Sequence, residues 1–154
     1  MLDTILVKPL KYGILNDTDL LSRFKMPLVS TEVFANQSGK FVARSTASAS
    51  LAVTATTELL GYANTHAHTV GTGEVAEIYN DIRMHVVIPS TDTDFLTSMR
   101  GKTCDIKCAG VTSVQYADLD ASATDILVIY DGDATLDIVE VGLNPLKMFT
   151  TGVV

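Results

Sequence analysis

The stretch "TDILVIYDGDATLDIVEVG", residues 124–142, is the clearest structural signal in the chain. Residues 126–130 form a short apolar run of strand-favouring residues, and residues 136–141 return to an apolar pattern. Between the two runs, Asp131 and Gly132 form a dipeptide that is a strong signal for a tight turn. The stretch therefore predicts a β-hairpin that turns at Asp131 and Gly132.

The same alternation of apolar and polar residues continues through most of the chain after residue 30. "SASLAVTATTE", which begins at Ser48, alternates small apolar residues with serine and threonine. Residues 74–90 continue the pattern and predict two paired strands, with a turn or bulge at 79–81. "KTCDIKCAG" and "VTSVQYADL", residues 102–119, predict a second hairpin. Roughly eight to ten short strands favour a mainly β fold, a single β-sandwich or β-barrel body.

Length and charge limit the function classes. The chain has 154 residues, which suits one domain with its own core. Residues 1–44 contain six lysines and arginines against four acidic residues, a net charge of +2. Residues 45–154 contain five against fourteen, a net charge of −9. Nucleic-acid phosphates repel such an acidic body, so we expect no nucleic-acid partner. The leader's positive charge either suits an acidic protein surface or belongs to an ordinary solvated mixture.

The first thirty residues differ from the rest because they show little periodicity. Pro9 and Gly13 interrupt any regular element there. The segment is apolar but too short to bury its own side chains, so we expect it to lie on another surface. The sequence thus predicts an irregular, extended N-terminal arm at residues 1–30 and a β-rich body domain at residues 31–154.

The sequence shows neither a targeting segment nor a membrane span. The N-terminus has Asp3 where a signal peptide has basic residues, and it lacks a long apolar run. The small-residue stretch near residue 47 is too short and too polar to cross a bilayer. Cys104 and Cys108 would lie about 13 Å apart on a strand, too far to form a disulfide. We therefore expect no membrane partner, and two free thiols in a protein made in a reducing cytosol.

"GYANTHAHTVGTGE", residues 61–74, is the stretch that most resembles a metal site. His66 and His68 would project from the same side of a strand, as two ligands of one ion must. The stretch resembles the first motif of the cupins, a double-sheet jelly-roll family. It departs from that motif because four residues, not five, separate Gly61 from His66. Five residues, rather than three or four, separate His68 from Glu74.

A metal site here would have to combine His66 and His68 with either His85 or Glu74. His85 lacks the glycine and proline context of the second cupin motif. Near-miss motifs are common in β-rich chains, so surface or inter-subunit histidines at a strand end are the favoured interpretation. The sequence accordingly predicts no bound metal.

Other catalytic motifs have little support in the sequence. "DGD" at residues 131–133 looks like a fragment of a calcium loop, but the twelve-residue pattern is absent and turn chemistry accounts for it. The chain has no G-x-S-x-G elbow, no G-x-G-x-x-G loop and no Walker-type loop. We therefore expect no catalytic residues and no cofactor, and we predict that the protein is not an enzyme.

The chain as a whole resembles the small decoration, or cement, proteins of tailed-bacteriophage heads. Three features carry the resemblance: the irregular leader "MLDTILVKPLKYGILNDTDLLSRFKMP", the Thr/Ala/Val-rich β-body, and the late stretch "TDILVIYDGDATLDIVEVGLNPLKMF". The resemblance covers most of the chain and is one of overall style rather than of a diagnostic motif.

The resemblance implies a structural virion protein that forms a homotrimer and binds the major capsid protein on the outside of an assembled head. Such a protein stabilises the capsid lattice, and it would be made in the host cytoplasm and reside on the capsid surface. Apolar leader residues would become buried on the shell, and basic ones would pair with acidic shell residues. The expected contact residues are Leu2, Ile5, Leu6, Lys8, Leu10, Lys11, Tyr12, Ile14, Leu15, Arg23 and Lys25.

Three alternatives stay open at this point. The chain could be another virion component, such as a tail or baseplate β-module. It could be a cupin-like metalloenzyme that uses His66 and His68. Independently of function, the leader could supply an edge strand to its own body instead of reaching a partner, as terminal strands commonly do.

Overall fold

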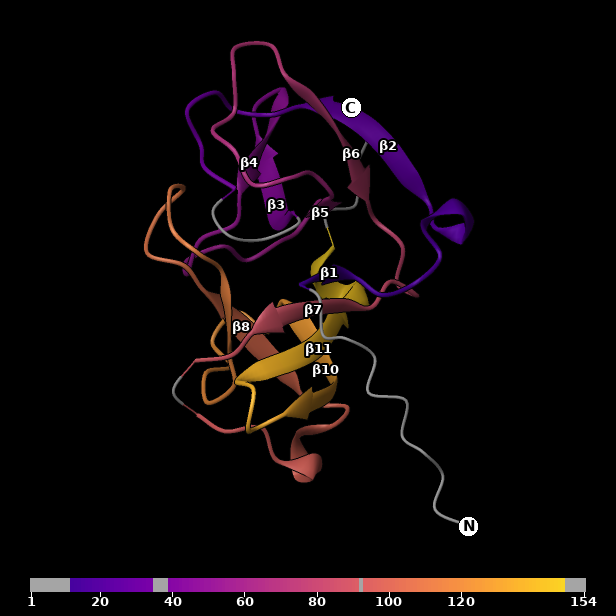
Figure 1. The fold of residues 1–154 in the computed structure, drawn as a ribbon, viewed down its shortest axis with the longest axis vertical. Helices are drawn as coiled ribbons and strands as arrows, with labels where there is room; N and C mark the ends of the chain where they lie inside the picture. The colour runs from indigo at the N-terminus through magenta and orange to yellow at the C-terminus, as the bar shows by residue number, and fades with distance from the viewer. Residues whose placement is uncertain (1–11, 35–38, 92, 149–154) are drawn as a thin grey trace.

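Short antiparallel strands make up most of the regular secondary structure, which confirms the mainly β prediction (Figure 1). The structure is a computed structural model, and it describes residues 12–34, 39–91 and 93–148. Two sheets pack together as a sandwich-like body. In the described part of the chain, no helix is long and apolar enough to cross a membrane.

Sheet A contains six strands in the order β1-β7-β11-β10-β8-β9. Their bounds are β1 Gly13–Ile14, β7 Val86–Pro89, β8 Thr103–Lys107, β9 Tyr116–Asp118, β10 Leu127–Asp133 and β11 Ile138–Leu143. A parallel bridge between Ser90 and Ala117 brings the end of β7 to β9, so the sheet curls on itself. Two short 3-10 helices follow β7 and β11, namely η2 (Thr97–Met99) and η3 (Pro145–Lys147).

Sheet B contains five strands in the order β2-β6-β5-β3-β4 and lies above sheet A in Figure 1. Its strands are β2 Arg23–Pro27, β3 Lys40–Ser45, β4 Ser48–Leu51, β5 Gly61–Ala63 and β6 Val75–Tyr79. A parallel bridge between Leu28 and Ala49 joins its two outer strands. The 3-10 helix η1 (Thr18–Leu20) precedes β2, and Asp17 caps it by accepting a hydrogen bond from the Asp19 N–H.

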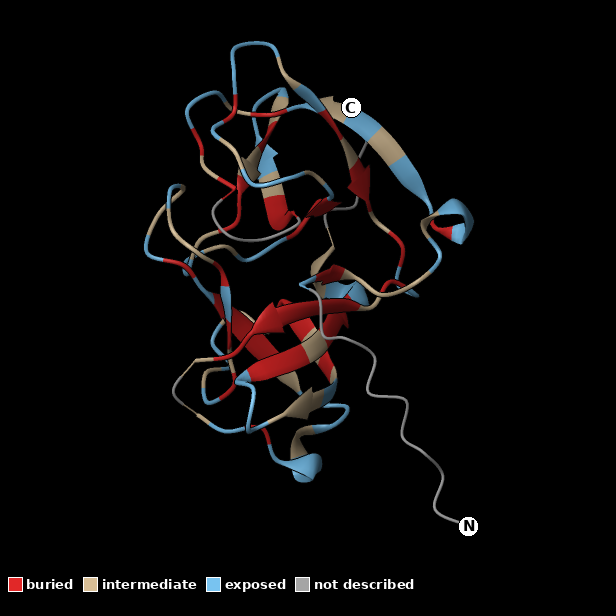
Figure 2. Cartoon of the chain, in the orientation of Figure 1, coloured by how far each residue is buried: buried red, intermediate tan, exposed pale blue. Residues whose placement is uncertain are grey.

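The main buried cluster draws chiefly on the strands of sheet A, which carry much of the red in Figure 2, and it includes Phe41, Tyr62 and Tyr79 of sheet B. Phe41 and Tyr62 of sheet B meet edge to face, with ring centroids 5.0 Å apart and planes at 77°. Both belong to one buried cluster with apolar residues of sheet A, among them Val86, Ile129 and Val141. A smaller buried cluster lies within sheet B and takes its members from β3, β4, β5 and β6. The shared cluster makes the two sheets a single packed unit.

The predicted hairpin of residues 124–142 is formed, but the predicted turn position is wrong. β10 pairs with β11, and Asp131 and Gly132 are paired strand residues within that ladder. The chain turns instead at residues 134–137. The hairpin is therefore longer than the Asp-Gly signal indicated.

Packing against a distant ring explains why a glycine stands at position 132. A Cβ atom on Gly132 would lie 2.6 Å from Cγ of Phe95, so only glycine leaves room for the phenyl ring. The register also shifts between Ile129 and Asp131, which leaves Tyr130 at a bulge. The residue that adopts a turn conformation is Asp137, with a φ of 50°. Glycine at 132 is thus a packing requirement, whereas the sequence signal treated it as a turn former.

The predicted hairpin of residues 102–119 is confirmed, because β8 and β9 pair antiparallel. The predicted pairing within residues 74–90 is wrong. β6 belongs to sheet B and β7 to sheet A, so the two strands are not neighbours. The segment between them, residues 80–85, carries the chain from one sheet to the other.

The second half of the predicted arm is part of the body. β1 pairs with β7 of sheet A, and β2 pairs with β6 of sheet B. For residues 13–27, the structure therefore forms the alternative in which the leader supplies edge strands to its own body. Residues 1–11 of the predicted arm lie outside the described residues.

Candidate functional site

The histidine loop, residues 64–74, connects β5 to β6 and lies against the segment 31–34. The Phe34 N–H donates to the His68 carbonyl at 2.8 Å, and the His68 N–H donates to the Phe34 carbonyl at 3.1 Å. The Val70 N–H donates to the Glu32 carbonyl at 2.8 Å. Backbone hydrogen bonds therefore join the loop to the segment 31–34.

The side chain of His68 binds two oxygens of the same loop. Its Nδ1 lies 2.7 Å from the His66 carbonyl oxygen, and its Nε2 lies 2.5 Å from Oε1 of Glu74. The other carboxylate oxygen of Glu74 accepts the Gly71 N–H at 3.0 Å. The hydrogen bond to the His66 carbonyl and the pairing with Glu74 raise the pKa of His68. The Gly71 N–H and His68 lower the pKa of Glu74.

Two further rings pack on His68. Its ring stacks on Phe34, with centroids 5.7 Å apart and planes at 13°. His66 also stacks on it, with centroids 4.3 Å apart and planes at 25°. Only 17% of the His68 side chain is exposed to solvent, so most of its surface contacts the protein.

His85 lies at a different site, so the three-histidine arrangement considered for a metal is not formed. The Nδ1 atom of His85 is hydrogen bonded to the carboxylate of Glu140 in sheet A. Its ring stacks on Tyr130, with centroids 4.1 Å apart and planes at 2°. Glu74 does meet His68, but as a hydrogen-bond partner. Among the residues that the structure describes, no group of three or more His, Cys, Asp or Glu side chains is arranged to hold a metal ion.

The predicted contact residues of the leader divide into three groups. Leu2, Ile5, Leu6, Lys8, Leu10 and Lys11 fall outside the described part of the chain. Ile14 packs against the main core, and the Leu15 N–H donates to the His85 carbonyl at 2.8 Å. Both residues thus contact the protein's own body while staying half-buried, and their contact with a partner stays a prediction. Tyr12 is 39% exposed and adjoins the edge strand β1.

Arg23 and Lys25 lie on β2, the edge strand of sheet B, where exposed and half-buried residues alternate (Figure 2). Arg23 is already engaged: its guanidinium donates to the Thr18 carbonyl at 2.8 Å and lies 3.6 Å from the Glu77 carboxylate. It also lies over the Tyr79 ring, 5.8 Å from the centroid. Lys25 is exposed on the same edge, directly opposite Glu77 in the ladder. Lys25 is therefore the more accessible of the two cations.

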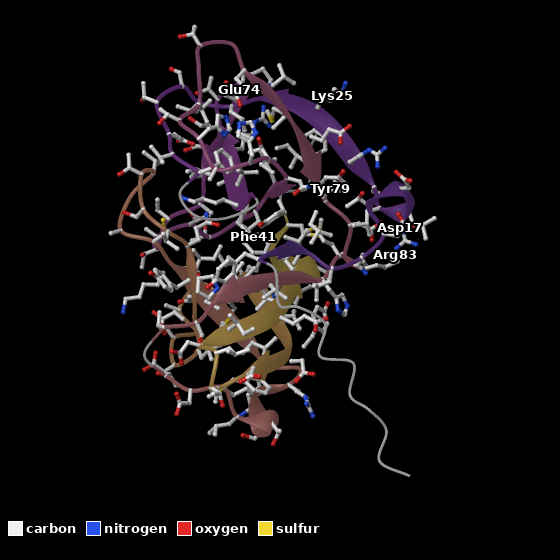
Figure 3. The ribbon with its side chains drawn as sticks, in the orientation of Figure 1. Asp17, Lys25, Phe41, Glu74, Tyr79 and Arg83 are labelled. Atoms are coloured by element: carbon white, nitrogen blue, oxygen red, sulfur yellow. The ribbon has the colours of Figure 1, made fainter. Side chains whose placement is uncertain are left out.

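The Asp81 carboxylate, together with Arg83, fastens the leader to the body. Asp81 accepts hydrogen bonds from the Ser22 N–H at 3.0 Å and from the Arg83 N–H at 2.8 Å. The Arg83 guanidinium binds the same carboxylate at 2.6 Å and donates to the Leu20 carbonyl at 2.9 Å. Figure 3 labels Arg83 and Asp17 on the side of the molecule where η1 lies. These bonds hold the pKa of Asp81 well below its usual value, chiefly through the Arg83 side chain.

We expect Asp81→Asn to lower the free energy of unfolding by about 2 kcal/mol, because several charge-assisted hydrogen bonds lose their ionised acceptor. The wild-type contribution is present above pH 3.8 and is lost as the pH falls through the lowered pKa of Asp81. Urea unfolding at neutral and acidic pH measures both effects. Asp94→Asn, at an exposed position, is the matched control. An equal loss in the control would contradict the assignment.

A cleft of about 610 Å³ opens beside β9. Its lining residues come from the end of β7 and from the β8–β9 hairpin: Ser90, Thr91, Lys107, Cys108, Ala109, Thr112, Ser113, Val114 and Tyr116. The Thr91 hydroxyl oxygen is buried and has no hydrogen-bond partner among the described residues. The hydroxyl groups and the Lys107 ammonium can form hydrogen bonds with a polar ligand.

Buried polar side chains that sequence reasoning missed hold this cleft in shape. Lys40 is fully buried and donates to the Val33 carbonyl at 2.7 Å and to the Ser113 carbonyl. The side chain of Gln115, also fully buried, binds the backbone of β3. No local signal marks either residue, because lysine and glutamine are ordinarily found on the surface.

The two predicted thiols are present as free, buried cysteines. Burial raises the pKa of Cys104 to about 12, and burial also raises the pKa of Cys108. Both thiols are consequently neutral near pH 7 and are poor nucleophiles.

Comparison with known proteins assigns no family to the chain. No protein-family model matches it, and no curated protein matches its sequence. Only the residues and their geometry therefore bear on what the protein does.

Proposed function

We propose that this chain is a structural protein of a tailed-phage virion that binds the outside of an assembled head as a homotrimer and stabilises the shell. The observation that carries the proposal is the division of the leader. Residues 13–27 are fastened to both sheets, whereas Tyr12, where the described chain begins, is exposed at an edge strand. Residues 13–27 are thus an anchor for the apolar segment that precedes them. If that segment binds a shell, the anchor connects the shell to the packed body.

Charge and exposure support the same proposal. The first eleven residues contain Lys8 and Lys11 and one acidic residue, Asp3, whereas residues 45–154 carry a net charge of −9. A basic segment on an acidic protein gives a docking orientation, because only one part of the molecule is attracted to an acidic shell.

An exposed apolar surface near the leader suits contact between copies. Leu20 is 70% exposed and Ile82 is 53% exposed. The hydrogen bond from Arg83 to the Leu20 carbonyl brings their two segments together. Exposed apolar residues on two segments that are joined in this way favour association between copies, because their burial removes apolar surface from water.

The test combines native mass spectrometry with binding to empty head shells of the phage that encodes the protein. We expect a homotrimer that saturates the shells. Lys8→Glu with Lys11→Glu should weaken shell binding by about tenfold, because two rim ion pairs become repulsive. Lys102→Glu with Lys107→Glu changes the charge equally at exposed positions of the body and serves as the matched control.

Each contrary result has a distinct meaning. A monomer that does not bind shells would overturn the proposal. Binding to isolated tails instead of heads would assign the chain to the tail or baseplate. One stoichiometric metal ion per chain, lost in His66→Ala or His68→Ala, would support the cupin-like enzyme.

A further inference from the structure

Both ring nitrogens of His68 face oxygens that can only accept hydrogen bonds. Nδ1 lies 2.7 Å from the His66 carbonyl oxygen, and a carbonyl has no proton to donate. Nε2 lies 2.5 Å from the carboxylate of Glu74. Because the pKa of Glu74 lies below its usual 4.5, that carboxylate is ionised near neutrality and also only accepts. A neutral imidazole carries one N–H and cannot satisfy both contacts.

We infer that His68 is held as an imidazolium, and that loss of its proton loosens the histidine loop where it packs against the segment 31–34. Deprotonation leaves one nitrogen lone pair facing an oxygen lone pair, at Nδ1 or at Nε2. The loop must then shift to separate them. His68 thus acts as a pH-sensitive latch.

The surroundings of His68 favour its positive charge. The Phe34 ring stacks against it and attracts a cation through its π face. Glu74 supplies the opposite charge and is itself fixed by the Gly71 N–H. The titratable group that opposes the latch is His66, whose ring lies 4.3 Å away, because a second positive charge there would repel the first.

Two charged groups lie at the segment 31–34, Glu32 within it and Lys40 bound to it, and neither competes for the His68 ring. The Glu32 carboxylate accepts hydrogen bonds from the Ser50 hydroxyl at 2.6 Å and from the Leu51 N–H at 2.7 Å. The Lys40 ammonium donates to the Val33 carbonyl at 2.7 Å. Glu32 is engaged with β4, and Lys40 with the Val33 and Ser113 carbonyls, so Glu74 remains the partner that sets the charge of His68.

The pH dependence follows from the direction of the shift. The closed loop binds the His68 proton more tightly than the open loop, because the pKa of His68 is raised from 6.5 when the loop is closed. The latch is fully effective below pH 6.5 and is lost as the pH rises through the raised pKa. In that interval, loop opening should increase about tenfold for each pH unit.

Nuclear magnetic resonance of the full-length protein tests the latch with two readouts. The side-chain nitrogen signals of His68 should show both ring nitrogens protonated at pH 6.5 and above it, up to the raised pKa. Exchange of the Phe34 and Val70 amide protons, corrected for intrinsic rates, should rise about tenfold per pH unit over the same interval. Both amides donate hydrogen bonds that join the histidine loop to the segment 31–34, so their exchange reports directly on opening of the loop.

Two variants separate the latch from a general effect of pH. Glu74→Gln keeps an acceptor but removes the charge, so the rise in amide exchange should begin at lower pH. Glu74 is 31% exposed on a loop, so the variant is expected to fold. His85→Gln removes the histidine of the His85–Glu140 pair at sheet A and should leave the exchange of the Phe34 and Val70 amides unchanged. A neutral His68 tautomer at pH 6, or amide exchange that does not follow the His68 titration, would overturn the inference.

Discussion

Replacing Gln115 with leucine is expected to lower the free energy of unfolding by about 3–5 kcal/mol, the largest single effect that we predict for a side chain. The side-chain amide of Gln115 forms hydrogen bonds with backbone groups, as a neighbouring strand would. Its Oε1 accepts the Phe41 N–H at 2.8 Å, and its Nε2 donates to the Phe41 carbonyl and to the Ala52 carbonyl, each at 2.8 Å. All of these groups are buried.

The size of the effect follows from what leucine leaves behind. The Phe41 N–H and the Ala52 carbonyl lose the partner that Gln115 supplies, and each buried polar group without a partner costs about 1–3 kcal/mol. The Phe41 carbonyl loses one of its two donors and keeps the Ala52 N–H at 3.0 Å. Gln115 directly precedes β9 of sheet A, whereas Phe41 lies on β3 of sheet B. The loss therefore weakens a connection between the sheets as well as a local hydrogen bond.

Urea unfolding monitored by circular dichroism measures this effect. Gln115→Glu should also be strongly destabilising at neutral pH, because an ionised carboxylate cannot donate to two carbonyl oxygens. Thr112→Ala, at an exposed position of the same loop, is the matched control and should change the free energy of unfolding by less than about 0.5 kcal/mol. A Gln115→Leu protein as stable as the wild type would show that the hydrogen bonds of this amide do not stabilise the fold.

The alternation of apolar and polar residues predicted the fold class, because a strand between core and solvent must alternate. It also predicted the β8–β9 hairpin, whose pairing is local in sequence. It failed where a distant residue decided the outcome. The Asp131-Gly132 signal is common to turns and to close packing, and only the position of Phe95 distinguishes the two.

The path between β6 and β7 could not be predicted for a similar reason. Residues 75–79 and 86–89 are both strand-like, and a local pattern predicts that such neighbours pair. The Asp81 carboxylate instead binds the Ser22 N–H, a residue 59 positions away, and the chain crosses to the other sheet. Polar contacts over such separations leave no periodic trace in a sequence.

The candidate site was predicted only in part. The spacing of His66 and His68 predicted two neighbouring rings on one side of a strand; the rings do meet, but on the loop between β5 and β6. The pairing of His68 with Glu74 lies within that loop and was considered, although as a metal set. Lys40 and Gln115 carried no signal, because hydropathy assigns polar side chains to the surface and the identity of their buried acceptors depends on the tertiary fold.

Lys40→Met is expected to lower the free energy of unfolding by about 2–4 kcal/mol. The methionine fills much of the same volume but leaves the Val33 and Ser113 carbonyls without the donor that Lys40 supplies. The loss is smaller than for Gln115, because the variant also avoids the cost of desolvating an ammonium group. That cost is visible in the wild type, where burial lowers the pKa of Lys40.

The pH dependence distinguishes this mechanism from a simple packing change. A lowered pKa means that the unfolded chain binds more protons than the folded one below pH 10.5. The wild-type free energy of unfolding should therefore rise as the pH increases from the lowered pKa toward 10.5. Lys40→Met removes that rise, whereas Lys102→Met, at an exposed position, should keep it. Urea unfolding across this pH range measures both slopes, and equal slopes in the two variants would show that Lys40 does not titrate in its buried site.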